Sequence, residues 1–277
     1  MLRIPEKVGT EVGKIKVDQL RILLDLVPRF TSLTILFFVA TAGANDGRSS
    51  TQNRSDSPKK LYSLQAINAA GQPVDLPKPP PELGKLLETG QVTIEFYDPK
   101  VSHHSFAGET HFEYQYTYDA RSDWKRKDQD GKPGIEISIR YNDIRLQLSH
   151  RILLPQEMIG EDLFERSLTL HEFDHVRISA DIRLAKLLEK MLKERNAVVT
   201  KVLDEEADEF SGKPTAKDFA RISKRMVKEE SDRVFDDFVA VVSIRYQELD
   251  RTSNYGRMPL SQDDRLRIIE SEPKPSE

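Results

Sequence analysis

The sequence predicts an α+β fold in which a small, mostly antiparallel β-sheet packs against two long helices. The main observation is a change of period along the chain. Between residues 91 and 155, apolar side chains recur at every second position, as in strands that bury one face. From about residue 161 onward they recur every three or four positions, as in helices that bury one side.

The strand period occurs in three runs, which cover 91–98, 110–120 and 134–155. The third run changes phase between Ile139 and Ile144, so we expect two successive strand segments there. The segment 128–134 has the sequence DQDGKPG, and its glycines and proline predict a turn between the second and third runs.

The helical period occurs in two stretches, the first from 161 to about 194 and the second from 218 to about 249. The segment 204–218 between them contains Gly212 and Pro214, which disfavour a continuous helix. The two stretches therefore predict two long helices that cover the sheet.

Composition excludes several classes of function. The 277 residues are 38% hydrophobic and the net charge is −4, which suits one globular domain with polar ends. Lysine and arginine are spread along the chain, so we expect no nucleic-acid partner. The absence of cysteine excludes disulfides, thiolate-bound zinc and a thiol nucleophile. Phosphate-binding glycine loops and the G-x-S-x-G motif of serine esterases are also absent.

The first 44 residues predict a signal peptide. Basic residues precede the apolar run 33–44, which ends in the cleavage-site pattern Ala42-Gly43-Ala44. A membrane span needs about 20 apolar residues and this run has about 12, so we expect no stable span in the mature chain. The alternatives are an uncleaved anchor or a short buried helix. Cleavage would make the protein extracytoplasmic, either periplasmic or secreted.

The remaining chain divides into three expected parts. Residues 45–60 are polar and nearly free of apolar side chains, which predicts a disordered linker. The folded domain is expected over 61–260, and residues 261–277 are expected to form a polar tail. The oligomeric state is left open.

The helix predicted around residue 170 contains the pattern H-E-x-x-H, formed by His171, Glu172 and His175. The four-residue spacing places both imidazoles on one helix face, where two ring nitrogens can bind Zn²⁺. Glu172 lies beside the first ligand and can take a proton from zinc-bound water. The alternative is a pair of core histidines, with Glu172 in an ordinary surface ion pair. Asp174 occupies an inner position of the motif, and we expect it to pair with Arg177.

A catalytic zinc ion needs a third protein ligand, and the sequence leaves several candidates open. Glu230 and Asp237 lie on the apolar side of the second long helix, where a buried acid needs a partner. Asp181 follows His175 by six residues, but the helical pattern continues through it. The remaining candidate region is the loop 249–256, which includes Tyr255.

The order of these features resembles a bacterial domain family of unknown function, described as predicted secreted zinc-dependent proteases. The resemblance covers roughly residues 61 to 257 and implies a zincin-like fold, with the motif helix packed on a sheet. The matching residues are Leu153, Leu154, Pro155, His171, Glu172, His175, Asp250 and Gly256.

This chain departs from the family in its late loop. The family tends to read Tyr-Asp-x-x-Thr-x-His-Gly there, and its histidine is implied as a third zinc ligand. Here Ser253 replaces the threonine and Tyr255 stands in place of the histidine. A phenol with a pKa near 10 is a poor zinc ligand but a good donor to a developing oxyanion. We therefore assign Tyr255 a catalytic role, the alternative being that it packs over the loop.

Together these observations predict an exported zinc metallopeptidase with a peptide or protein substrate. We expect the substrate strand to add to an exposed sheet edge within 135–148. The first alternative is a non-catalytic extracytoplasmic binding or structural domain derived from a zincin, with or without zinc. The second is a hydrolase of another polymer, such as cell-wall peptide crosslinks.

Overall fold

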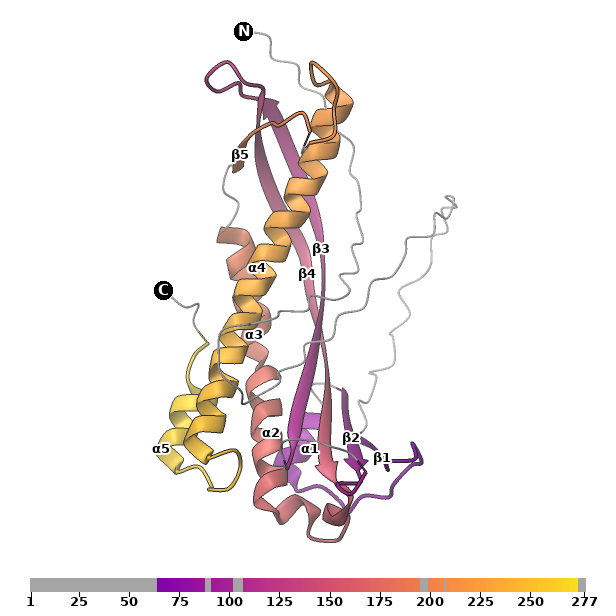
Figure 1. Ribbon diagram of the computed structural model, residues 1–277. Helices are drawn as coiled ribbons and strands as arrows, with labels where there is room; N and C mark the ends of the chain where they lie inside the picture. The colour runs from indigo at the N-terminus through magenta and orange to yellow at the C-terminus, as the bar shows by residue number, and fades with distance from the viewer. Residues whose placement is uncertain (1–63, 88–90, 102–106, 195–198, 207, 274–277) are drawn as a thin grey trace, which may run out of the picture.

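The protein has an α+β fold with one mixed sheet, seen in a computed structural model (Figure 1). The structure describes residues 64–87, 91–101, 107–194, 199–206 and 208–273. The predicted signal peptide and linker lie outside these ranges. Within the described ranges, no helix combines the length and the apolarity that a membrane crossing requires.

The sheet contains five strands, namely β1 (Leu64–Ile67), β2 (Gln91–Tyr97), β3 (Glu109–Arg126), β4 (Gly134–Pro155) and β5 (Val199–Val202). Its order is β1-β2-β4-β3, and β5 pairs with the beginning of β4. The β1–β2 and β2–β4 pairs are parallel, whereas β3 and β5 run antiparallel to β4. The expectation of a mostly antiparallel sheet is therefore confirmed only in part: the longest pair is antiparallel, but two of the four strand pairs are parallel. A two-residue period indicates a buried face but not the direction of the neighbouring strand.

Strands β3 and β4 form a long hairpin that extends away from β1 and β2 (Figure 1). Asp130 and Gly131 at its tip have φ of 51° and 77°, so the predicted turn is confirmed. The phase change in β4 is a bulge within one continuous strand. The register shifts at this point, and Asp143 has a φ of 48°.

The helices are α1 (Pro81–Leu87), α2 (Ser167–Ser179), α3 (Ile182–Glu194), α4 (Ala216–Ser253) and α5 (Gln262–Arg265), followed by a π-helical segment, Leu266–Glu270. The first predicted long helix is thus two helices of 13 residues each. The break lies at Asp181, whose carboxylate accepts a hydrogen bond of 3.0 Å from the backbone N–H of Arg183. This local bond caps α3, and helical spacing alone does not reveal it.

Helix α4 is the second predicted long helix, with 38 residues. Thr215 and Asp218 form a capping box at its start, and Asn254 ends it in the left-handed conformation. Its aromatic side chains meet those of β3 in an antiparallel series. The ring pairs, with centroids 4.2 to 5.3 Å apart, are Phe112–Tyr246, Tyr114–Phe238, Tyr116–Phe235 and Trp124–Phe219.

This series fixes α4 along the whole hairpin, with its C-terminal end beside the beginning of β3. Figure 1 shows α4 along the hairpin, while α2 lies at the end that holds β1 and β2. The buried residues form two clusters, one between the hairpin, α3 and α4, and one between β1, β2, α1 and α2. Helix α2 contributes to both, because Phe173 and Val176 belong to the second cluster and Ile178 to the first.

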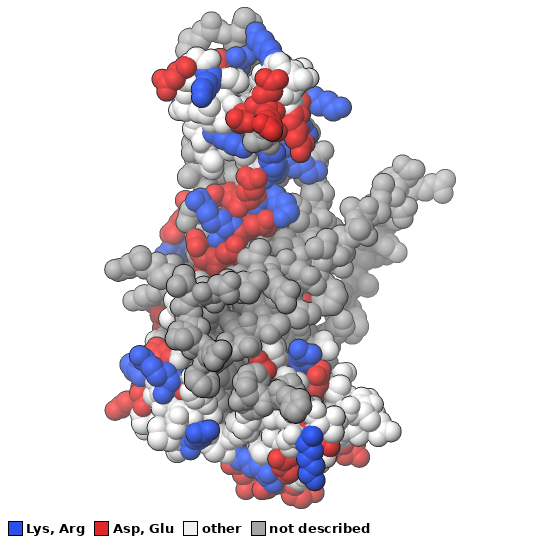
Figure 2. All heavy atoms as spheres, viewed as in Figure 1, with Lys and Arg blue, Asp and Glu red and all other residues white. Residues whose placement is uncertain are grey.

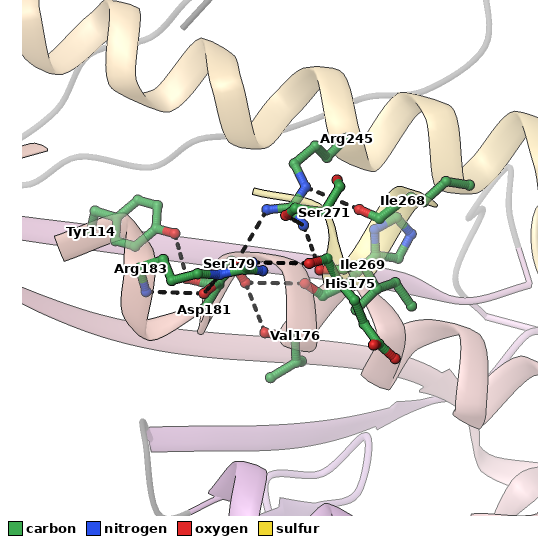
Figure 3. Close-up of polar contacts among 11 residues, drawn as sticks. Tyr114, His175, Val176, Ser179, Asp181, Arg183, Arg245, Ile268, Ile269 and Ser271 are labelled. Carbon is green, nitrogen blue, oxygen red and sulfur yellow. Dashed lines mark hydrogen bonds and ion pairs between the residues drawn. The ribbon is translucent and has the colours of Figure 1, made fainter. Parts of the chain in front are cut away.

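The segment after residue 261 is not the polar tail that the sequence predicts. It is helical over 262–270, and Ile268 and Ile269 are buried in the larger cluster. Arg245 of α4 is itself buried and donates hydrogen bonds of 3.0 and 2.5 Å to the carbonyls of these two residues (Figure 3). The folded domain therefore extends at least ten residues beyond the expected boundary at residue 260.

Charges of both signs are mixed on the one face of the protein that Figure 2 shows. On the face shown in Figure 2, lysine and arginine are interspersed with aspartate and glutamate at both ends of the molecule. On this face, basic residues are therefore not gathered into one patch.

Candidate metal centre

The H-E-x-x-H motif lies in the middle of α2, where the helix is enclosed by β3 and α4. His171, Glu172 and His175 are 7%, 2% and 5% exposed, respectively. The two imidazoles share the helix face turned toward α4, and the ring of His175 lies 4.3 Å from that of Tyr246. The motif is therefore directed into the protein, as the apolar spacing of the sequence predicts.

Asp250, in the last turn of α4, completes a group of three donors with these histidines. Its Oδ1 lies 3.1 Å from Nε2 of His171 and 2.9 Å from Nε2 of His175. The two Nε2 atoms are 3.2 Å apart. All three donor atoms converge on one point from two helices that are far apart in the sequence.

This donor set fits a zinc ion. Two imidazoles and one carboxylate form a common protein ligand set of catalytic zinc. Ligand atoms about 2.0–2.1 Å from a tetrahedral zinc ion lie about 3.3 Å from one another, close to the three spacings seen here. One donor atom from each residue leaves a fourth position for a water molecule or a substrate.

The electrostatics of the group favour an ionised carboxylate. Burial raises the pKa of Asp250, but hydrogen bonds to His171 and His175 outweigh it and lower the pKa to about 2. Burial lowers the pKa of His171, yet the hydrogen bond to Asp250 and the nearby carboxylates raise it overall. A carboxylate that is already ionised at neutral pH needs no deprotonation before it binds a cation.

Glu172 faces the beginning of β3 and is held there by Thr110. The hydroxyl of Thr110 donates a hydrogen bond of 2.7 Å to Oε2 of Glu172. Oε1 lies beside Gly108, where an added Cβ would be only 2.6 Å away. Burial raises the pKa of Glu172, although the charges of His175 and His171 and the Thr110 bond oppose the shift. A buried carboxylate with a raised pKa is suited to accepting a proton.

The charged residue inside the motif has its own partners. Asp174 pairs with Arg177, as the sequence predicts, and with Arg265 of α5 at 3.0 Å. Asp174 is buried, so the two guanidinium groups compensate for its desolvation. The unusual charge at this position therefore joins the motif helix to the C-terminal segment.

The end of α2 is also held by side chains of three other elements, of which Figure 3 shows Tyr114. Tyr114 of β3 donates a hydrogen bond of 2.5 Å to the carbonyl of Ser179. Tyr246 of α4 donates one of 2.9 Å to the Ser179 hydroxyl, and His150 of β4 lies 2.6 Å from the same oxygen. These bonds fix the helix that holds both histidines.

Of the candidates for the third ligand, the region 249–256 supplies Asp250, whereas Glu230, Asp237 and Asp181 are not brought to the histidines. Glu230 pairs with Arg233 at 2.5 Å, and Asp181 pairs with Arg183 at 2.6 Å. Asp237 is exposed. Because α4 rises 1.5 Å per residue, Glu230 and Asp237 lie about 30 and 20 Å from Asp250 along the helix.

Tyr255 is directed partly to solvent. Its side chain is 50% exposed, and within the described part of the chain no hydrogen bond joins its hydroxyl to the motif. The same turn instead brings Ser253 and Gly256 against His171.

The sequence indicates the loop 249–256 as a candidate ligand region but does not single out Asp250 or Ser253 within it, and it does not indicate Thr110. Asp250 could have been found, because it matches the aspartate of the family's late-loop pattern. The helical period, however, predicts that the second helix ends near residue 249, which leaves Asp250 in the loop. No sequence signal could have indicated Thr110, since its role depends on the approach of β3 to α2.

Comparisons of the chain with protein-family models, curated proteins and solved structures gave no match.

Proposed function

We propose that the protein is an exported zinc metallopeptidase in which His171, His175 and Asp250 hold the metal and Glu172 is the general base. The single observation that supports this most strongly is the convergence of the three donor atoms within 3.2 Å of one another. Zinc at such a site lowers the pKa of a bound water to about 7 and polarises a carbonyl. Export rests on the signal-peptide pattern of residues 1–44.

In this mechanism the residues around Glu172 determine which of its oxygens moves the proton. Thr110 already donates to Oε2, so Oε1 is the oxygen that accepts the proton of the attacking water. The same oxygen then delivers this proton to the leaving amine. The general base of a hydrolase typically contributes about 10²–10⁴-fold to the rate.

The substrate strand is proposed to lie along β3, not along 135–148 as expected from the sequence. One side of 135–148 pairs with β3, and on the other side β5 pairs only with 134–137, so among the described strands 138–148 is also an open edge. We place the substrate on β3 because the beginning of this strand lies beside Glu172. Among the described strands, β3 pairs only with β4, so its other side is a sheet edge. Gly108 and Thr110 place the beginning of this edge beside Glu172. A peptide added there would pass the general base.

The test is a matched pair of variants of the full chain. Glu172→Gln is expected to retain zinc, measured by metal analysis, and to lose peptide hydrolysis by about 10²–10⁴-fold. Glu157→Gln, which changes an exposed carboxylate outside the motif, is the control and keeps both. Hydrolysis retained by Glu172→Gln would exclude the mechanism.

One observation favours a second function, a non-catalytic domain in which zinc joins two helices. Each motif side chain is more than 90% buried by the described part of the chain, as in structural metal sites. A protein that binds zinc at the three residues, is stabilised by it and cleaves no peptide would support this function over the peptidase.

A further inference from the structure

The turn that follows α4 encloses the ring of His171. Asn254, Tyr255 and Gly256 all have positive φ, of 50°, 56° and 74°. This backbone brings Gly256 so close to His171 that an added Cβ would lie 3.0 Å from three atoms of the imidazole side chain. Ser167 of α2 donates a hydrogen bond of 2.8 Å to the Gly256 carbonyl. The turn is thus attached to the helix that carries the histidines.

Ser253, the last residue of α4, lies on the side of the ring opposite the donor group. Its Oγ is 3.1 Å from Nδ1 of His171, while Nε2 faces Asp250. The serine is 1% exposed, so water does not compete for its hydroxyl. The two ring nitrogens of His171 therefore contact two residues of the same helix end.

The other partners of the Ser253 hydroxyl decide which atom gives the proton. A hydroxyl has one proton to donate and two lone pairs that accept. The proton has an acceptor in the Asp250 carbonyl, at 3.5 Å, and one lone pair accepts the backbone N–H of Gly256 at 3.1 Å. The remaining lone pair faces Nδ1 of His171, so this ring nitrogen is the donor.

We propose that Ser253 is a positioning residue of the metal centre: its hydroxyl accepts the Nδ1 proton of His171 and thereby directs the Nε2 lone pair of that ring toward the metal. The inference rests on the metal centre proposed above. The bond fixes both the tautomer and the rotation of the ring. Loss of such a partner typically weakens metal binding by about 10–100-fold.

The test measures the zinc dissociation constant of the full chain by competition with a chromophoric chelator. Ser253→Ala is expected to bind zinc about 10–100-fold more weakly than the wild type. The matched control is Ser231→Ala, a fully buried serine of α4 about 33 Å away along the helix. Its hydroxyl bonds to Val227 and Tyr141, so its removal tests the general cost of losing a buried serine from this helix. We expect its zinc affinity to stay within about threefold of the wild type, because it makes no contact with the donor group.

A second pair of variants separates hydrogen bonding from packing. Threonine and valine have nearly the same shape, but only threonine has a hydroxyl. We expect Ser253→Thr to bind zinc at least about fivefold more tightly than Ser253→Val, because the larger side chain disturbs both equally. Melting temperatures of the zinc-free variants report whether each of them folds.

Three results would overturn the inference. They are an affinity of Ser253→Ala within about twofold of the wild type, an equal loss in Ser231→Ala, and equal affinities of the threonine and valine variants. Failure of the wild-type protein itself to bind zinc would overturn the proposed metallopeptidase as well. Unchanged affinity in Ser253→Ala with normal zinc binding by the wild type would remove only the role of Ser253.

Discussion

His150 makes the stability of the fold depend on pH in a way that can be measured apart from the metal centre. It lies on β4, is 4% exposed and places Nε2 2.6 Å from the Ser179 hydroxyl. Burial lowers its pKa from 6.5 to about 3. The unfolded chain therefore takes up a proton at a higher pH than the folded protein does, and stability is lost as the pH falls from about 6.5 toward 3.

The size of the effect follows from the two pKa values. The difference between 6.5 and about 3 corresponds to about 5 kcal/mol when the loss is complete, and to about 2 kcal/mol between pH 7 and pH 5. Other groups also titrate in this range, so the wild type alone does not isolate this contribution. The variant His150→Gln keeps an amide donor for Ser179 but has no titrating group at this position. Between pH 7 and pH 5 its free energy of unfolding should therefore fall by about 2 kcal/mol less than that of the wild type.

The assay is urea unfolding at pH 7 and at pH 5, monitored by tryptophan fluorescence. Trp124 is the single tryptophan, and it stacks on Phe219 in the buried cluster between the hairpin, α3 and α4. A chelator in all samples removes any metal contribution. If the wild type and His150→Gln lose the same free energy of unfolding between the two pH values, then burial of His150 does not hold its imidazole neutral, and the reasoning fails.

Three further outcomes are expected. Asp250→Asn should weaken zinc binding by about 100-fold or more, whereas Asp237→Asn on the same helix should not, and equal affinities in a chelator competition would exclude Asp250 as a ligand. Gly108→Ala should displace Glu172, because the added Cβ would lie 2.6 Å from its Oε1. We expect peptide hydrolysis to fall at least about tenfold while zinc affinity stays unchanged. Full activity would show that Glu172 adjusts freely. Arg245→Met should cost about 2–4 kcal/mol and speed hydrogen exchange over 262–270, and unchanged exchange there would contradict its anchoring role.

Three of the five described strands were predictable because apolar side chains alternate along them, whereas the four-residue strands β1 and β5 were not expected and β3 runs six residues past the expected end at residue 120. The run 134–155 coincides with β4, and 91–98 matches β2 to within one residue. Strand direction was not predictable, because β2 pairs with β4 only after an intervening hairpin strand. The π-helical end was missed because two adjacent isoleucines in a charged stretch give no period to detect.

At the candidate site, the sequence indicated the residues that share one helix and missed those that reach it from elsewhere. His171 and His175 are joined by a local spacing of four. Asp250 reaches them only because the aromatic series between β3 and α4 sets how far α4 extends past α2. Tyr255 was favoured because of its chemistry, yet the three positive φ angles at the end of α4 place Ser253 and Gly256 against His171.

The length of α4 separates the two ends of this protein. Thirty-eight residues at 1.5 Å each span about 57 Å, with the tip of the β3–β4 hairpin near one end and Asp250 near the other. The tip is a polar turn, a place where inserted sequence is usually tolerated. A fluorescent reporter inserted after Gly131 would therefore lie at the end of the molecule opposite the two histidines. That geometry makes the tip a suitable attachment point for imaging or immobilising the protein with its chemistry intact.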